Sequence, residues 1–507
     1  MSVKRLNDSM IRGRWRRPVA LVLAMAAAIA PVGAQLPSLG DDHEFSPSAE
    51  RRIGERIARE LFRAPDYLDD PVLDAYVQSL WQPLLAAARQ RGDLPPEMDQ
   101  RYAWRVLLGK DRSVNAFALP GGWLGLHLGL VAATTSRDEL ASVLAHELSH
   151  VTQRHIARLM GKEKRQAPWV IGAMILGALA ASRSPDAAAA LITGGQAAGI
   201  QGQLNFSREM EREADRIGYG VMTQAGFQGQ AFVTMFEKLQ QASRLNDNGS
   251  FPYLRTHPLT LERIVDMRSR QPLGERQAPA RADLEHALMA ARARGLSAGG
   301  VELSQALLRE ADEVPVSGPG DASRQAAALY AGVLAAMQLR DPERAQRYVD
   351  RLSPRVAHDR EGARLVRLLS AEVALARGDA PQALAMVQGT GVSARPDVLL
   401  SAQAAVRAGR AAEAVQRLQT WVALHPGDAT AWQLLAAAHA AQGQALRAIR
   451  AEAEARVAWL DYPAALDRLR AAQEMARQGG ADHFEASIID TRARAVESLL
   501  REQALER

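Results

Sequence analysis

The chain has 507 residues, more than one ordinary hydrophobic core supports, so its length predicts two or more domains. Apolar residues make up 47% and charged residues 23%, which excludes a disordered chain, and the absence of Cys excludes disulfides and thiolate ligands. The formal net charge of +5 lies within residues 1–34, where six Lys and Arg face one Asp, so the remainder offers no basic excess for nucleic acid.

The N-terminus has the pattern of a secretory signal. Basic residues precede an apolar run from Pro18 to Ala30, and Val32-Gly33-Ala34 supplies the small residues that a signal peptidase recognises. The run is short for a membrane span of about 20 residues. Residues 1–34 are therefore predicted to be a cleaved signal peptide, with an uncleaved anchor as the alternative. An exported chain without Cys indicates a periplasmic protein.

Helices and then strands are expected next. Residues 47–92 show helical spacing of apolar residues, with Ser48 as a candidate cap. Alternating or β-rich segments predict three strands, at 102–108, 114–119 and 123–128. A Pro-Gly-Gly sequence predicts a turn between the second and third. We expect the third strand to be an exposed edge to which an extended substrate could add as another strand.

A helix is predicted to begin at Ser136, which has capping-box spacing to Glu139, and to end near Met160. Two apolar segments within 168–200 are each too short for a normal membrane span. They predict a buried or interfacial helical hairpin, with peripheral membrane contact as the alternative. Further helices are expected over one charged and two mixed segments: 206–225, 228–245 and 258–270.

Beyond a Pro, Gly and Arg-rich linker at 272–282 the sequence is helical throughout and contains weak repeats. Gly378, Gly409 and Gly443 are 31 and 34 residues apart at expected helix–helix turns. The last unit fits the tetratricopeptide pattern through Trp432, Leu435, Gly443 and Ala448. The sequence predicts about four stacked helix pairs in a repeat domain at 283–507, after a first domain at 35–272.

The sequence His146-Glu147-Leu148-Ser149-His150 carries the strongest chemical signal. Two His four residues apart lie on one helical face and can bind one Zn²⁺, and Glu147 beside them can take a proton from water. A chance occurrence, or a surface helix with satisfied His, is the alternative.

A catalytic zinc needs a third protein ligand. The extended zincin pattern would put a His at position 156, which is Ile156, so that branch is excluded. His155 is one residue away and is interpreted as an ordinary helix residue. The other branch takes a carboxylate from a second helix, where Glu211 and Asp215 share a face. Composition leaves two competing ligand candidates open: Glu209 and Glu213.

The motif His146 to His150, followed by Glu211-Arg212-Glu213-Ala214-Asp215, resembles the gluzincin family of HtpX-type membrane proteases and CAAX prenyl proteases. The segment Asn115 to Gly122 is similar to a strand–turn element of that family. The resemblance implies a mainly α protein: an α+β zincin (gluzincin) peptidase domain with a small sheet, followed by an α-solenoid of tetratricopeptide-like repeats.

The same resemblance implies roles for individual residues. It makes Glu211 the third ligand of one Zn²⁺ and Asp215 an acid that orients a ligand or donates a proton. Thr256-His257-Pro258 matches a segment whose His is a removable fourth ligand. A self-inhibited resting state is then expected; a loop His fixed by the following Pro is the alternative.

The expected activity is hydrolysis of peptide bonds in unfolded or misassembled outer-membrane proteins in the periplasm. The repeats are expected to recruit substrate or to dock to the outer-membrane barrel assembly machinery. This part rests on the resemblance. The rival hypothesis is a chaperone or adaptor that acts through the repeats while the metal site stays largely closed.

Overall fold

The computed structural model describes most of the chain from residue 46 onward: 46–162, 207–245, 251–271, 283–315, 321–388, 394–478 and 483–504. The predicted signal peptide, the apolar stretch 168–200 and the linker 272–282 lie outside the described residues. Phe45–Arg507 form one compact unit. In the described stretches, no helix has both the length and the apolar character that a membrane crossing requires.

The first two helices, α2 (Pro47–Arg63) and α3 (Pro71–Arg91), fall within the predicted helical region. The cap of α2 is Ser46, whose Oγ accepts from the Ala49 backbone N–H at 3.2 Å, so the prediction of Ser48 was wrong. Pro47 explains the difference, because Pro is favoured at the first position of a helix, directly after the cap.

A four-stranded sheet follows, formed by β1 (Tyr67–Leu68), β2 (Arg105–Gly109), β3 (Ala116–Leu119) and β4 (Trp123–His127). The strand order is β1-β2-β4-β3; β2 and β4 are parallel and the other pairs are antiparallel. The three predicted strands are confirmed, but the prediction that the third is an edge was wrong. β4 lies inside the sheet and β3 is the edge next to it.

The predicted strand at 102–108 begins too early. The short helix α4 (Pro96–Arg101) ends directly before it, and Trp104 has a positive φ of 48°, so pairing starts at Arg105. The predicted turn is confirmed: Gly121 and Gly122 have φ of 72° and 81°. A Cβ on Gly121 would lie 2.5 Å from the Cα of Arg51, so the turn packs against the α2 backbone.

The helix α6 (Arg137–Thr152) follows α5 (Leu128–Ala133) and is buried from Glu139 to its end. Its predicted cap is confirmed, with Ser136 Oγ accepting from the Glu139 N–H at 3.2 Å. The predicted end near Met160 was wrong. Arg154 has a left-handed φ of 52°, and a separate helix, α7 (His155–Lys162), begins after it.

The predicted charged helix is α11 (Arg208–Gln224), capped by Ser207. It crosses α6 closely, since a Cβ on Gly218 would lie 3.1 Å from the Ala145 carbonyl oxygen. The helices α12 (Gln230–Leu245) and α14 (Leu261–Ser269) confirm the next two predictions. The single-turn helix α13 (Tyr253–Thr256) between them is too short to leave a periodic signal.

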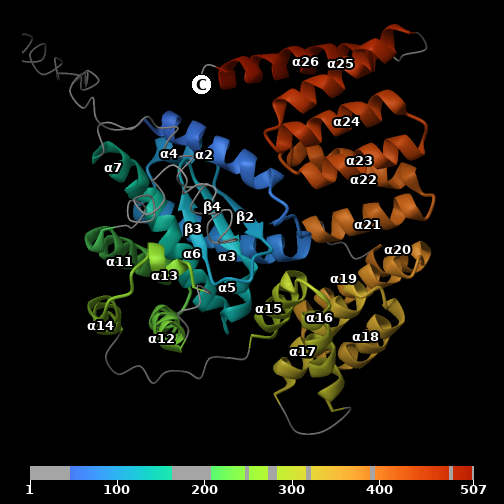
Figure 1. Ribbon diagram of the computed structural model, residues 1–507. Helices are drawn as coiled ribbons and strands as arrows, with labels where there is room; N and C mark the ends of the chain where they lie inside the picture. Colours follow the sequence, from blue (N-terminus) through green and yellow to red (C-terminus); the bar gives the residue numbers. More distant parts are fainter. Residues whose placement is uncertain are drawn as a thin grey trace, which may run out of the picture. The chain divides into compact units, whose positions relative to one another are not determined.

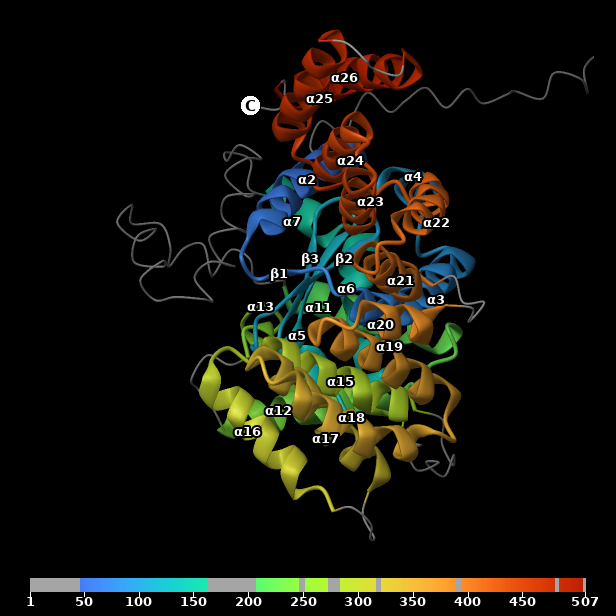
Figure 2. The same ribbon diagram turned by 90° about the vertical axis from the view of Figure 1, so that its right-hand side faces the viewer.

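The C-terminal region is helical, as predicted; in Figures 1 and 2, α17 and α18 lie near the bottom of this region and α25 and α26 at its top. Its helices are α15 (Leu284–Ser297), α16 (Val301–Glu313), α17 (Ala322–Gln338), α18 (Pro342–Val356), α19 (Arg360–Ala376), α20 (Ala380–Val387), α21 (Arg395–Arg407), α22 (Ala411–Leu424), α23 (Ala429–Ala441), α24 (Ala445–Ala458), α25 (Tyr462–Arg477) and α26 (His483–Ala504). The chain is therefore mainly α with a small sheet.

The three turn glycines of the predicted repeats each lie between paired helices, with φ of 72° to 82°. Arg340, between α17 and α18, and Leu460, between α24 and α25, occupy the same position in their turns, with φ of 59° and 60°. The αL position ends the helix that precedes each turn. Whether these pairs are tetratricopeptide repeats stays a prediction.

Two arginines, the buried Arg292 and the half-buried Arg395, join the helical region to the residues directly before α3. Arg292 of α15 makes two hydrogen bonds to Asp70, at 2.8 and 2.7 Å, and also pairs with Glu372. Arg395 of α21 pairs with Asp69 at 2.8 Å and with Asp428. Two adjacent carboxylates, between β1 and α3, are thus each held by a different helix of the C-terminal region.

Candidate metal centre

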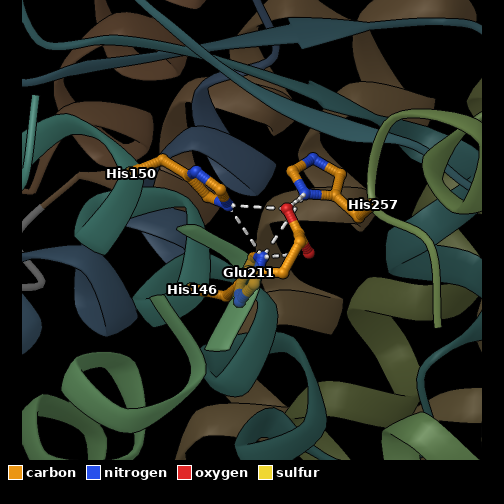
Figure 3. Close-up of side chains that lie close together, drawn as sticks. All are labelled: His146, His150, Glu211 and His257. Carbon is orange, nitrogen blue, oxygen red and sulfur yellow. Dashed lines mark hydrogen bonds and ion pairs between the residues drawn. The ribbon is translucent and has the colours of Figure 1, made fainter. Parts of the chain in front are cut away.

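The centre is built from three elements that converge on one buried point (Figure 3). His146 and His150 come from α6, Glu211 from α11, and His257 from the residue directly after α13. One ligand atom from each of these four residues lies within 4.8 Å of the other three. The structure therefore brings together the three predicted ligands and the predicted fourth one.

The distances between ligand atoms fit a single tetrahedral metal. Nε2 of His146 lies 3.0 Å from Nε2 of His150 and 3.6 Å from Oε2 of Glu211. Nδ1 of His257 lies 3.4 Å from Nε2 of His146 and 3.0 Å from Oε1 of Glu211. Ligand atoms about 2.0–2.1 Å from a common tetrahedral centre are about 3.4 Å apart. Three imidazole nitrogens and a carboxylate are a donor set that holds a divalent transition metal.

The site is closed to solvent. Each predicted site residue is at most 1% exposed: His146, Glu147, His150, Glu211, Asp215 and His257. Tyr253 stacks on the ring of His257, with centroids 4.6 Å apart and planes at 26°, and its carbonyl accepts from the His257 N–H at 2.9 Å. A loop of one helical turn therefore holds His257 at the centre.

Glu147 lies beside the ligand cluster and not in it. Its two carboxylate oxygens have no hydrogen-bond partner of normal geometry among the described residues, and Nε2 of His257 approaches Oε1 to 3.5 Å. Burial raises the pKa of Glu147, while the charges of His257 and His146 and the Ala118 backbone amide act to lower it. A buried carboxylate of raised pKa next to a metal is suited to accept a proton.

Asp215 orients His146. Oδ1 of Asp215 lies 3.0 Å from Nδ1 of His146, so this nitrogen is the donor and Nε2 faces the cluster. Desolvation lowers the pKa of His146, but Asp215 and Glu211 together raise it to about 9. Protons and a metal therefore compete for this imidazole.

The other two ligands carry the protonation states that a metal requires. Burial lowers the pKa of His150 well below its usual value, which leaves the ring neutral. Burial would raise the pKa of Glu211, but His257 and the hydrogen bonds from neighbouring His lower it well below the usual range. A neutral imidazole and an ionised carboxylate can both act as ligands without losing a proton.

Among the acidic candidates for a third ligand, Glu211 is the one that lies with the histidines. Glu209 is exposed, and Glu213 points to His155 and Arg158 at 3.1 and 2.8 Å. Of the four acidic candidates on α11, only Glu211 places an oxygen in the ligand cluster.

Sequence reasoning missed Arg263. Its guanidinium makes two hydrogen bonds to Asp215, at 2.6 and 2.7 Å, and contacts Oε2 of Glu211 at 2.7 Å. Arg263 also donates to the Pro258 carbonyl at 2.9 Å. The only sequence signal for it is its place on the buried face of α14, beside Ile264 and Met267.

The interpretation of His155 as an ordinary helix residue was wrong. The ring is fully buried, and its Nδ1 lies 2.9 Å from Nδ1 of the ligand His150. A continuous helix would have turned it away, but the break at Arg154 folds it back against α6.

Comparison with known proteins gives matches over both regions of the chain. Residues 71–271 match peptidase family M48. The putative beta-barrel assembly-enhancing protease of Vibrio cholerae is 37% identical over 257 residues, covering 49% of this chain and 51% of that protein. The beta-barrel assembly-enhancing protease of Escherichia coli K12 is 31% identical over 441 residues, or 85% of each chain. The mitochondrial metalloendopeptidase OMA1 of Saccharomyces cerevisiae is 27% identical over 205 residues, 38% of this chain and 55% of that protein.

The lengths of these matches differ. The chain spans about half the length of the Vibrio relative, whereas the E. coli match continues well beyond residues 71–271 into the C-terminal helices. The match to OMA1 covers 38% of this chain, so it cannot include both the peptidase region and the C-terminal helices in full.

Proposed function

Since the chain belongs to peptidase family M48 and is a metalloendopeptidase, we propose that it hydrolyses peptide bonds with one Zn²⁺ held by His146, His150 and Glu211. The observation that carries this proposal is the buried cluster of ligand atoms, whose spacing fits a tetrahedral ion. The donor set of nitrogen and carboxylate oxygen is the one that catalytic zinc prefers.

The reaction needs a base, an oriented ligand and an electrophile. When bound, zinc supplies Lewis acidity, which polarises a carbonyl oxygen and makes water more acidic. Glu147 is proposed to take the proton from the attacking water and to pass it to the leaving amine. Asp215, held by Arg263, keeps His146 in the tautomer that points Nε2 to the cluster. This arrangement favours the orienting role of Asp215 over that of a proton donor.

The substrate chain is proposed to bind along β3. The carbonyl of Asn115 accepts from the His127 N–H, so antiparallel pairing turns the main-chain groups of Ala116 and Ala118 to the other side of the strand. The Ala118 amide lies close to Glu147. An extended peptide that pairs with this edge would pass the general base with little dependence on its side chains.

His257 is proposed to hold the enzyme in a closed resting state. Its Nδ1 lies 3.4 Å from Nε2 of His146 and 3.0 Å from Oε1 of Glu211, and its Nε2 lies near Glu147, so it would exclude water from a bound metal and from the base. The complete burial of the site supports this proposal. Activity then requires displacement of His257.

We also propose that the protein acts in the periplasm on unfolded or misassembled outer-membrane proteins. The names of the Vibrio and E. coli relatives support a role in barrel assembly, and the signal pattern at the N-terminus supports export. The C-terminal helices, included in the E. coli match, are proposed to recruit substrate or to contact the barrel assembly machinery.

The closed site also favours a second function. An adaptor or chaperone would work through its C-terminal helices and would need no open metal centre. A strain that carries an inactive peptidase distinguishes the two functions. Its outer membrane should stay intact if the protein acts as an adaptor and should be impaired if hydrolysis is required.

The deciding variant is Glu147→Gln. It keeps the shape of the side chain but cannot accept a proton, so zinc content should stay at about one per chain while casein hydrolysis falls by roughly 10²–10⁴-fold. The exposed Glu262→Gln is the matched control and should retain activity. Full hydrolysis by Glu147→Gln would refute the assigned base, and absence of zinc from the wild type would refute the metal site.

A further inference from the structure

The break after α6 places a second histidine behind a metal ligand. In an uninterrupted helix, His155 would lie about 140° around the axis from His150. Instead, Arg154 adopts φ 52°, and its Nε donates to Oε1 of Glu50 of α2 at 2.8 Å. Glu50 is 3% exposed, so this ion pair holds the break within the protein core.

Donor and acceptor roles along this contact follow from the ligand cluster. Nε2 of His150 faces Nε2 of His146 and Oε1 of Glu211, so it must be free of a proton to bind a metal. Nδ1 of His150 therefore carries the hydrogen, and Nδ1 of His155, 2.9 Å away, is its acceptor. The hydrogen of His155 is then on its Nε2.

The series of hydrogen bonds from His150 through His155 ends at a carboxylate on α11. Nε2 of His155 lies 3.1 Å from Oε2 of Glu213, which also accepts from Arg158 at 2.8 Å. Glu213 is two residues after Glu211, so one helix supplies both a metal ligand and the carboxylate that terminates this chain. The contacts are directional and leave each His one tautomer.

From this geometry we propose that His155 is a positioning residue for the metal, acting through His150 and held by Glu213. The inference rests on the proposed metal site. His155 fixes the ring rotation and tautomer of His150 and makes its Nε2 a better donor. Asp215 lies 3.0 Å from Nδ1 of His146, so the Nδ1 atoms of both motif histidines have a polar partner on the side away from the cluster.

The test is zinc affinity, measured by chelator competition on the full chain. His155→Leu removes the acceptor and should weaken zinc binding by about 10–100-fold, and the visible spectrum of the Co²⁺ form should change. His155→Gln offers an amide oxygen to His150 and an amide N–H to Glu213, so it should recover most of the affinity. His439→Leu, a buried His far along the chain on α23, is the control and should bind zinc normally.

A second variant covers a failure of His155→Leu to fold. Glu213→Ala removes the partly exposed carboxylate at the end of this series of hydrogen bonds, and it should weaken zinc binding by about tenfold. Wild-type affinity in His155→Leu or in Glu213→Ala would overturn the inference and leave the proposed function intact. A wild-type protein that binds no zinc would instead overturn the proposed function.

Discussion

At the scale of single residues, side chains outside the candidate metal centre fix the orientation of its histidine rings. Asp215 and His155 contact the Nδ1 atoms of His146 and His150, and Arg263 fixes Asp215 in turn. The two Nε2 atoms face each other at 3.0 Å as a result. The site therefore needs little rearrangement to take a metal, which favours tight binding.

Removing the fourth ligand tests the closed state. We expect His257→Ala to raise casein hydrolysis by about tenfold, which corresponds to about 1.4 kcal/mol in favour of the closed form. Zinc should remain bound, because three ligands are kept. His439→Ala, which deletes a buried His elsewhere, should leave the rate unchanged. A fall in the rate of His257→Ala would count against self-inhibition.

The pKa of His146 predicts how metal binding depends on pH. This pKa is raised to about 9 in the metal-free protein, so below pH 9 a proton occupies the ring and must leave when zinc binds. Apparent zinc affinity should rise by about tenfold per pH unit between pH 6 and 8. Chelator competition at several pH values checks this, and a flat profile would contradict the assignment.

The two candidate His ligands could be predicted because their spacing is local, whereas the choice of Glu211 among the acidic residues of α11 came from the family resemblance. His146 and His150 are four apart, and Glu211 and Asp215 are four apart, so each pair shares a helix face whatever the tertiary fold. Arg263 has no such pattern, since its partners come from another helix. His155 was misjudged because the left-handed residue that redirects it is an Arg and not a Gly.

At the scale of elements, the edge strand β3 makes a prediction about substrates. If a peptide pairs with the outward groups of Ala116 and Ala118, its own amides should bond at every second position. N-methylation of a peptide substrate, one amide at a time, should lower kcat/KM by roughly 2–10-fold at alternate positions. An even effect along the peptide would exclude strand addition.

The crossing of α11 over α6 is close enough to control the metal centre. A side chain at Gly218 would meet the Ala145 carbonyl and the His146 backbone at 3.1–3.2 Å. Gly218→Val should push the helices apart, cost about 1–3 kcal/mol and weaken zinc binding. Gln224→Val, at an exposed position of the same helix, should do neither. Equal zinc affinity in both variants would refute the argument.

Most helices could be predicted from periodicity, and the cap at Ser136 could be predicted from its spacing to Glu139. Strand order could not, because alternation within 123–128 says nothing about which neighbours pair with it. β4 is interior because β2 also pairs with it, in parallel, through residues 18 positions earlier in the chain, such as Arg105 with Trp123. The helix end at Thr152 depends on the Arg154–Glu50 ion pair, whose members are 104 residues apart.

At the scale of the whole molecule, the buried Arg292 connects α15 to the start of α3. Replacing it by Met leaves the carboxylates of Asp70 and Glu372 without their shared cation, and should lower the free energy of unfolding by about 3–5 kcal/mol. Arg294→Met is the control, since its pair with Glu310 is about 40% exposed and is worth about 1 kcal/mol or less. Urea unfolding measures both, and equal losses would contradict the structural role.

The repeat pattern was only partly visible in the sequence. Three turns carry Gly and were found, whereas Arg340 and Leu460 adopt the same left-handed φ without the residue type that signals it. Packing of the paired helices around such a turn supports the strain, which sequence patterns cannot report. The links from Arg292 and Arg395 to adjacent aspartates join distant segments and were likewise unpredictable.

If His257 closes the resting enzyme as proposed, the contacts of Arg263 limit how it can open. This one side chain holds Asp215 and also the carbonyl of Pro258, directly after His257. An effector that pulled α14 away would take Arg263 with it, release Asp215 and free His146 to rotate. It would give an open protein that binds its metal more weakly. An effector that rotates only the segment from Tyr253 to His257 would open the site and keep its ion, so productive activation is a motion of one helical turn.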